Sequence, residues 1–180
     1  MTGETAPEAV RPPQPPAPTP ARPQPSPQPP SLLLDDQLCF ALYAAQRAVT
    51  ARYRPLLEAL GLTYPQYLTM LVLWERDAVA VRDLGAALQL ESSTLSPLLK
   101  RLEAHGLVRR ERRADDERSV EIRLTSAGRE LREKARTVPL DMGAAMALTP
   151  EQDAAAKQLL RRLTANVSGG PEAAGGPGTP

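Results

Sequence analysis

The stretch from Arg82 to Thr125 constrains the fold of this chain more than any other part of it. Its first segment, VRDLGAALQL, is short and amphipathic, and after a break a second segment follows with helical spacing, SSTLSPLLKRLEAHG. An arginine-rich stretch with alternating apolar residues, LVRRERRADDERSVEIRLT, comes next and is typical of a β-hairpin. Two short helices and a basic hairpin in this order form a winged helix-turn-helix. In that fold one helix enters a major groove of DNA and the hairpin reaches an adjacent groove.

The two ends of the chain differ in composition from its centre. Twelve of the twenty prolines lie between Pro7 and Pro30, and residues 168–180 are rich in glycine, proline and alanine. Such segments cannot bury enough apolar surface to offset the entropy lost on ordering. We therefore predict a disordered proline-rich arm over residues 1–31 and a flexible tail over 168–180. One domain remains over 32–167, with its DNA-reading unit at 79–125.

The spacing of apolar residues predicts a chain that is mainly α-helical with a small β-wing. The first helix is expected from Leu32 to about Leu60, and Gly61 ends it because glycine readily takes left-handed dihedrals. Thr63 and Gln66 then form a capping-box pattern. The elements expected after this cap are a helix to about Arg76, a short strand over 79–82, a helix from about Asp83, a helix from Ser93 to Gly106, strands over 107–112 and 119–124 with Val120, Ile122 and Leu124 inward, a helix from Thr125 to about Ala135 or beyond, and a last helix from Thr149 to about Asn166.

The start of the expected DNA-reading helix depends on Pro97. Both Ser92 and Ser93 are candidate N-caps. A proline is harmless only within the first four helical positions, where its missing N–H would have no partner. A cap at Ser93 places Pro97 fourth, so we favour Ser93.

The charge and the apolar pattern of the sequence limit which partners the chain can have. The net charge is only +1, and although four of the five residues 109–113 are arginine, acidic residues 115–117 follow at once. A modest electrostatic footprint of this kind favours binding to double-stranded DNA by two copies. The first and last helices also carry more apolar surface than the winged unit can cover. This predicts a homodimer built from the chain's ends, the alternative being that these helices pack on each other within one chain.

Several classes of protein are excluded by what the sequence lacks. It has no run of eighteen apolar residues and no apolar signal-peptide core, so we expect no membrane partner. A lone cysteine forms no disulfide framework and fits a reducing, cytoplasmic location. His105 is expected at the surface near a helix end, and no metal or cofactor site is predicted around it.

The single cysteine, Cys39, is the candidate for chemistry. Taken alone, a cysteine in an apolar helix is most often a small buried residue. A cap at Asp35 or Asp36 would place Cys39 in the first turn, where the helix dipole favours the reactive thiolate, although the aspartate charges oppose this mildly. Tyr43 lies one turn away, and all six aromatic residues fall between positions 40 and 74. Tyrosine hydroxyls can donate to a thiolate while their rings form an apolar pocket.

Several stretches together resemble a known family of regulators. The run Asp116-Glu117-Arg118, the strand VEIRLT and the start Ala127-Gly128-Arg129 resemble the wing and next helix of the multiple-antibiotic-resistance regulator (MarR) family. Within that family, LCFALYAAQRAV, YRPLLEALGLTYPQYLTMLVLWE and TLSPLLKRLEAHGLV are similar to the organic hydroperoxide resistance regulators. The resemblance covers about residues 34–135, which include both the sensing and the DNA-reading segments.

The resemblance implies a dimeric cytosolic repressor that leaves its operator when an organic hydroperoxide oxidises Cys39. The tyrosines that hydrogen-bond the thiolate in that group map onto Tyr43, Tyr53 and Tyr64. Some members also carry late cysteines that resolve the sulfenic acid. This chain has none, so it resembles the one-cysteine class. Its sulfenic acid would then form either a mixed disulfide with a small thiol or a sulfenamide.

The DNA contacts are expected to divide into phosphate-binding and base-reading groups. The resemblance implies that Arg118, oriented by Asp116, is the wing-tip arginine, and an arginine there fits a narrow minor groove. Basic side chains would position the protein on phosphates and hydroxyl side chains would reach base edges. Capping and solvation are the alternative roles of these hydroxyls, and this alternative is strong for Ser93. The phosphate group comprises Lys100, Arg101, Arg112 and Arg113, and the base-reading group comprises Ser92, Ser93, Thr94 and Ser96.

Three alternatives compete with the redox-sensing repressor. The first is a MarR-type repressor released by a reversible small ligand, with Cys39 incidental. The second is a thiol peroxidase, but the chain has no second cysteine, metal site or paired acid and base to support turnover, so we predict that it is not an enzyme. The third is a structural DNA-bending protein, which would bind all sequences with similar affinity.

Overall fold

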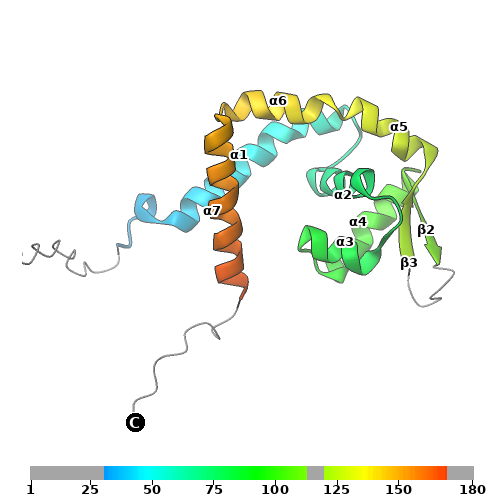
Figure 1. The fold of residues 1–180 in the computed structure, drawn as a ribbon, viewed down its shortest axis with the longest axis horizontal. Helices are drawn as coiled ribbons and strands as arrows, with labels where there is room; N and C mark the ends of the chain where they lie inside the picture. Colours follow the sequence, from blue (N-terminus) through cyan, green and yellow to red (C-terminus); the bar gives the residue numbers. More distant parts are fainter. Residues whose placement is uncertain (1–30, 113–119, 170–180) are drawn as a thin grey trace, which may run out of the picture.

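The computed structural model describes residues 31–112 and 120–169, and Figure 1 shows how its elements are arranged. The expected mainly α-helical chain with a small β-wing is confirmed. In chain order the elements are η1 (Leu34–Asp36), α1 (Leu38–Glu58), α2 (Tyr64–Glu75), β1 (Val79–Ala80), α3 (Val81–Leu88), α4 (Ser92–Ala104), β2 (Val108–Arg112), β3 (Val120–Leu124), α5 (Ser126–Lys134), α6 (Thr137–Met146) and α7 (Pro150–Ser168).

The long helices and the winged unit occupy different ends of the molecule. Helix α6 lies along the second half of α1, and α7 turns down across α1 on the side away from the sheet (Figure 1). Helices α2, α3 and α4 pack beside the strands at the other end. The first turn of α1 therefore projects away from the winged unit within one chain.

The three strands form an antiparallel sheet in the order β1-β3-β2. Val108 pairs with Leu124, and Val79 pairs with Ile122. Ile122 and Leu124 are buried and Val120 is half-buried, so the predicted inward face of the second hairpin strand is confirmed. The sheet closes one side of the core beneath α2 and α4.

The hydrophobic core joins the helix-turn-helix to the sheet. Burying a leucine or isoleucine side chain contributes about 1.5–3 kcal/mol, so these contacts hold α3 and α4 in a fixed relation to the wing. The side chains that are almost completely buried are Leu57, Tyr67, Thr69, Met70, Leu73, Leu84, Leu95, Leu99, Leu102 and Ile122.

Most predicted helix ends are confirmed by local hydrogen bonds. Thr63 and Gln66 form the capping box, in which the Thr63 backbone N–H donates to Gln66 Oε1 over 2.8 Å. The Thr125 hydroxyl accepts from the Gly128 N–H at the start of α5. Gly61 and Gly106 follow α1 and α4 with φ of +67° and +69°. Thr149 and Gln152 form a second capping box at the start of α7.

The beginnings of two helices differ from the prediction. Helix α1 starts at Leu38 instead of Leu32, because Gln37 has an extended backbone and separates it from η1. Gln37, and neither Asp35 nor Asp36, is thus the N-cap. Helix α3 starts at Val81, two residues before the predicted position.

The expected cap of α4 at Ser93 is wrong. The helix begins at Ser92 with Glu91 as its N-cap, and the backbone N–H groups of Thr94 and Leu95 both donate to the Glu91 carbonyl. Glu91 has an extended backbone and takes the N-cap position without a side-chain cap hydrogen bond, so the helix begins before either serine can cap it. Pro97 therefore lies at the sixth helical position.

Helix α6 was not predicted as a separate element. Pro139 and Gly143 within it lower its helix propensity, but Val138 and Met142 are buried against the rest of the chain. Tertiary burial therefore supports a helix that local preferences leave undecided.

Gly128 locks α5 against the hairpin and α2. A Cβ at this position would lie 2.1 Å from the Leu107 carbonyl oxygen, a backbone atom that cannot move aside freely. The Gly128 carbonyl in turn accepts a hydrogen bond of 2.8 Å from Trp74 Nε1. Only glycine allows this close approach.

We expect Gly128→Ala to lower the free energy of unfolding by about 3 kcal/mol, because the added methyl overpacks a site bounded by backbone. Urea unfolding followed by circular dichroism, at fixed protein concentration, measures the change. Gly143→Ala is the matched control, since nothing lies within 4 Å of the added Cβ and alanine favours helix by up to about 1 kcal/mol. Equal stabilities for the two variants would contradict this account of Gly128.

The predicted excess of apolar surface on the end helices is present within one chain. Exposed fractions reach 61% at Leu38, 54% at Tyr43, 54% at Leu159 and 45% at Leu160. Among residues 31–112 and 120–169, no helix is long and apolar enough to cross a membrane. The predicted proline-rich arm and most of the predicted tail lie outside the described residues.

Candidate DNA interface and thiol site

Helix α4 presents a polar face opposite its buried leucines. Ser92, Ser93, Thr94, Lys100 and Arg101 are all exposed, whereas Ser96 is half-buried. The stripe farthest from the core repeats at the helical spacing through residues 93, 97, 100 and 104. The structure therefore exposes every predicted DNA-contacting residue of α4 except Ser96.

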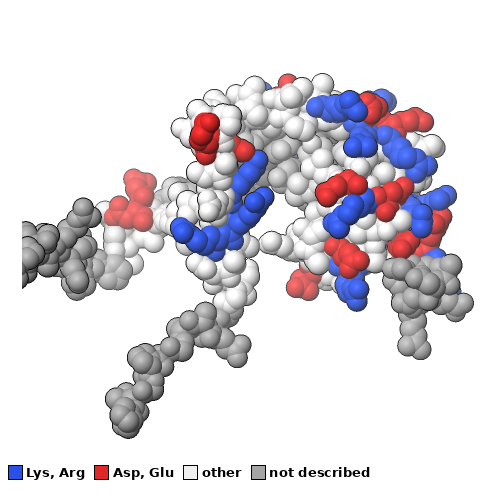
Figure 2. Space-filling model, viewed as in Figure 1, with Lys and Arg blue, Asp and Glu red and all other residues white. Residues whose placement is uncertain are grey.

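The hairpin arginines are mostly paired with glutamates. Arg123 Nε lies 2.8 Å from Glu111 Oε2, Arg109 Nη2 lies 2.9 Å from Glu111 Oε1, and Arg110 Nε lies 3.4 Å from Glu103 Oε2. Figure 2 shows the resulting mixture of acidic and basic side chains over this end of the molecule. The positive field of the hairpin is thus weaker than its arginine count alone predicts.

Arg112 is the predicted contact at the end of β2, where its side chain is exposed. The predicted wing contacts Arg113, Asp116 and Arg118 lie outside the described residues. Their roles on DNA stay predictions.

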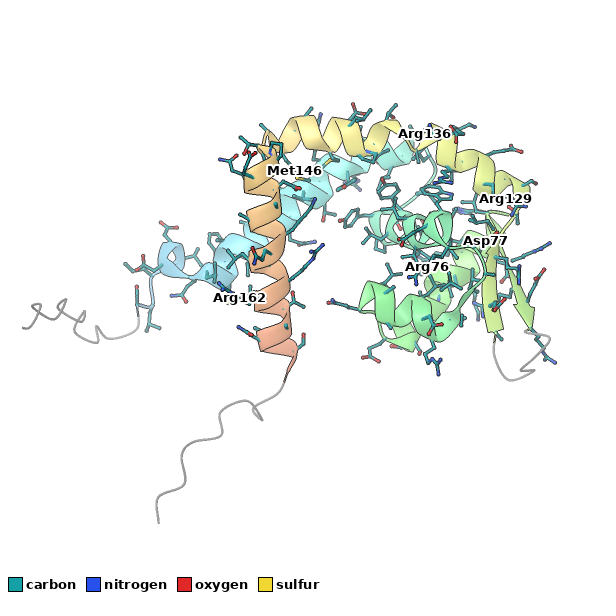
Figure 3. The ribbon with its side chains drawn as sticks, viewed as in Figure 1. Arg76, Asp77, Arg129, Arg136, Met146 and Arg162 are labelled. Carbon is teal, nitrogen blue, oxygen red and sulfur yellow. The ribbon has the colours of Figure 1, made fainter. Side chains whose placement is uncertain are left out.

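The root of the wing is fixed by Asp77, which was not predicted as a functional residue because no sequence pattern marks it. Its Oδ1 accepts 2.9 Å hydrogen bonds from the backbone N–H groups of Leu124 and Ala78. Its Oδ2 lies 3.4 Å from Arg129 Nη1, which also donates to the Leu124 carbonyl over 2.9 Å. Figure 3 shows Asp77 and Arg129 together at the side of the sheet. This cluster ties the end of β3 to α2 and α5.

Cys39 is exposed and is the second residue of α1, so its predicted position in the first helical turn is confirmed. Tyr43 follows one turn later. Its hydroxyl accepts a 2.9 Å hydrogen bond from Arg47 Nη1, whose guanidinium carbon lies 5.5 Å from the ring centre. Arg47 therefore holds Tyr43 from the side away from Cys39 without using the tyrosine proton.

The other two predicted tyrosines form a separate pair. The ring centres of Tyr53 and Tyr64 lie 4.6 Å apart, and that of Tyr67 lies 5.9 Å from Tyr53. Burial, followed by the charge of Tyr64, raises the pKa of Tyr53, and burial also raises the pKa of Tyr67. At neutral pH the phenols of Tyr53 and Tyr67 keep their protons and can act as hydrogen-bond donors. Tyr67 is a buried member of this stack that the sequence did not single out.

The two halves of the predicted sensing site do not meet within one chain. Tyr53 lies fourteen residues after Cys39 on the same helix, which corresponds to about 21 Å along the axis. One chain thus brings together Cys39 with Tyr43, and Tyr53 with Tyr64, as two separate clusters.

Comparisons with known proteins agree with this arrangement. Residues 51–135 match the family model for transcriptional regulators SarA/Rot. The organic hydroperoxide resistance transcriptional regulator of Bacillus subtilis is 48% identical over 130 residues, which cover 72% of this chain and 86% of the relative. The chain belongs to the organic hydroperoxide resistance regulators of the MarR family. It is a transcriptional regulator and not an enzyme.

Solved structures of AbfR have the same fold as this MarR-family chain. AbfR of Staphylococcus epidermidis is 35% identical, with a TM-score of 0.64, over 75% of this chain and 94% of that one. A structure of reduced AbfR bound to DNA is 34% identical, with a TM-score of 0.63, over 75% of this chain and 92% of that one.

A cavity of about 620 Å³ lies between α1 and the start of α2 in this regulator. Its walls include Tyr64 of one cluster and Arg47, which donates a hydrogen bond to Tyr43 of the other. Its other lining residues are Gln46, Thr50, Ala51, Arg54, Leu57, Glu58, Leu62, Thr63 and Pro65. Among the described residues, no cluster of histidine, cysteine, aspartate and glutamate has metal-binding geometry.

Proposed function

We propose that this regulator is a dimeric repressor that leaves its operator when an organic hydroperoxide oxidises Cys39. One observation carries the proposal: the exposed thiol lies in the first turn of α1, one turn from Tyr43. The thiolate is the form that attacks peroxides, and an exposed sulfur is one that a peroxide can reach.

Dimerisation through the chain's ends accounts for two features of the single chain. It covers the exposed apolar side chains of α1 and α7. It also offers a way for the thiol of one subunit to meet the Tyr53 and Tyr64 pair of the other. The alternative, in which the end helices cover these side chains by packing on each other within one chain, is not favoured, because the side chains are exposed in the single chain.

The proposed DNA contacts follow the exposed face of α4 and the hairpin. AbfR, a similar protein, has been solved bound to DNA. Here Lys100, Arg101 and Arg112 would contact phosphates, together with Arg113 of the wing. The hydroxyl side chains of residues 92–94 and Ser96 would reach base edges in the major groove.

The proposed oxidation of Cys39 takes place in two steps. The Cys39 thiolate attacks one peroxide oxygen, the O–O bond breaks, and the products after proton transfer are a sulfenic acid and an alcohol. The sulfenic acid then condenses with a small thiol to a mixed disulfide, or with a backbone nitrogen to a sulfenamide, and water leaves in either case.

The added group would displace tyrosine side chains at the subunit interface and shift the two reading heads. Half-sites on B-DNA lie about 34 Å apart, so a shift of a few ångströms loses base and phosphate contacts in both. We expect such a repressor to act in the cytosol, where thiols are kept reduced.

The proposal is tested by treating the DNA-bound protein with cumene hydroperoxide and following it by gel shift and intact-mass spectrometry. We expect release to follow modification of Cys39 in time and extent, and dithiothreitol to restore binding when the product is a disulfide or sulfenamide. DNA release while Cys39 remains unmodified would contradict the proposal.

The second candidate is a repressor released by a reversible small ligand. The cavity beside Arg47 favours it, because a largely apolar space with a guanidinium at its edge suits an organic anion, although Arg54 in the same wall is paired with Glu58. Such a ligand would be lost on dialysis with no change in protein mass, which separates the two functions.

A further inference from the structure

Pro97 leaves one backbone carbonyl of α4 without its helical partner. In an α-helix the N–H of residue 97 would donate to the carbonyl of residue 93, and proline has no N–H. Because α4 begins at Ser92, Pro97 lies in the second turn, where this hydrogen bond would otherwise form. The Ser93 carbonyl is therefore an acceptor left open by the sequence itself.

This carbonyl belongs to the face of α4 that points away from the core. The four buried leucines at positions 95, 98, 99 and 102 define the inner face. Ser93, Pro97 and Lys100 are all exposed and lie opposite them. In the free protein water can satisfy the Ser93 carbonyl, so the open acceptor is tolerated.

Insertion of α4 into a major groove would remove that water, and an acceptor left unsatisfied after desolvation weakens binding. We propose that the Ser93 carbonyl oxygen accepts a hydrogen bond from the amino group of a cytosine or an adenine in each half-site. This inference rests on the proposed function, in which α4 is the DNA-reading helix.

The chemistry of the groove determines which bases fit. Cytosine N4 and adenine N6 carry the donors on the major-groove edge, whereas guanine offers N7 and O6 and thymine offers O4 and a methyl group. A guanine or thymine facing the Ser93 carbonyl would place acceptor against acceptor. Because the contact uses the main chain, the identity of residue 93 matters less than the proline four residues later.

The test uses a duplex selected from a random DNA library by the wild-type dimer, with each base pair of a half-site then changed in turn. We expect one cytosine or adenine position per half-site where a change to guanine or thymine weakens binding about tenfold. Pro97→Ala supplies the missing N–H, which would occupy the Ser93 carbonyl. The preference at that position should then fall to less than about twofold while the other positions keep theirs.

Two matched variants separate this effect from changes in side chain or stability. Ser93→Ala removes the hydroxyl that is proposed to reach a base edge but keeps the carbonyl. A preference read by the hydroxyl should therefore be lost, whereas the preference at the position that responds to Pro97→Ala should persist. Pro55→Ala makes the same chemical change inside α1, away from the DNA, and should leave every base preference intact. Because alanine favours helix over proline, Pro97→Ala should unfold at a urea concentration no lower than wild type, which excludes misfolding as the cause.

The proposal is overturned if Pro97→Ala keeps the full preference at every position, or if Ser93→Ala removes it. It is also overturned if the wild-type dimer selects specific duplexes but no position prefers cytosine or adenine. A wild-type protein that binds all duplexes equally would instead contradict the proposed repressor function itself.

Discussion

Replacing Cys39 by serine should abolish the response to organic hydroperoxides and leave operator affinity within about twofold of wild type. Serine has nearly the same shape as cysteine, but its hydroxyl does not ionise at neutral pH and does not take part in thiol oxidation chemistry. Cys39 lies in the first turn of α1, which projects away from α4 and the sheet (Figure 1), so the substitution does not touch the DNA-reading surface. Gel shifts across a range of cumene hydroperoxide concentrations measure both effects.

Methionine sulfur provides the matched control for this experiment. Peroxides also oxidise thioethers, and Met146 is 42% exposed, whereas Met70 and Met142 are buried. Figure 3 shows Met146 at the junction of α6 and α7. Met146→Leu should therefore respond to peroxide as the wild type does. If the Cys39→Ser protein still left DNA on peroxide treatment and the Met146→Leu protein did not, the trigger would be the sulfur of Met146, and the role proposed for Cys39 would be contradicted.

Features of the fold that depend on neighbours in sequence could be predicted. The capping box at Thr63 and the left-handed residues Gly61 and Gly106 are set within a few residues, so local chemistry determines them. The alternating hairpin strand also follows from a pattern of period two. These features were sufficient to indicate the winged unit.

The parts that the sequence concealed depend on contacts between distant residues. Asp77 binds the Leu124 N–H across 47 positions, and Trp74 binds the Gly128 carbonyl across 54. Ala78 and Gln89 take positive φ at two turns without being glycine, so no residue type marks those turns. The two-residue error in the cap of α4 has another origin, because the N-cap is Glu91, which makes no side-chain cap hydrogen bond and is therefore not marked by a capping residue type.

The candidate thiol site could be predicted residue by residue but not as an assembly. The sequence indicated Cys39 together with three tyrosines, and the structure separates Tyr53 and Tyr64 from the thiol by a distance that one chain cannot close. The missing information concerns a second subunit, and it can be supplied by a dimer whose two chains carry different substitutions.

In such mixed dimers, Tyr64 of the partner subunit should control the reactivity of Cys39. One dimer combines a chain that has Cys39 and wild-type tyrosines with a chain carrying Cys39→Ser and Tyr64→Phe. The other places Tyr64→Phe in the chain that keeps Cys39, opposite a Cys39→Ser partner. Phenylalanine keeps the ring, which lies 4.6 Å from that of Tyr53, and removes only the hydroxyl donor.

We expect oxidation of the single Cys39 by cumene hydroperoxide to slow about tenfold in the first dimer, because a hydrogen bond to an ionised group is lost. In the second dimer the rate should change by less than about twofold, since Tyr64 stacks on Tyr53, which lies about 21 Å along α1 from Cys39 of its own chain. Differently tagged subunits allow each mixed dimer to be purified, and intact-mass spectrometry follows the reaction. The cross-subunit site requires slowing in the first dimer alone. Slowing only in the second dimer, or equal slowing in both, would show that the hydroxyl acts within its own chain as well or instead, and would contradict that site.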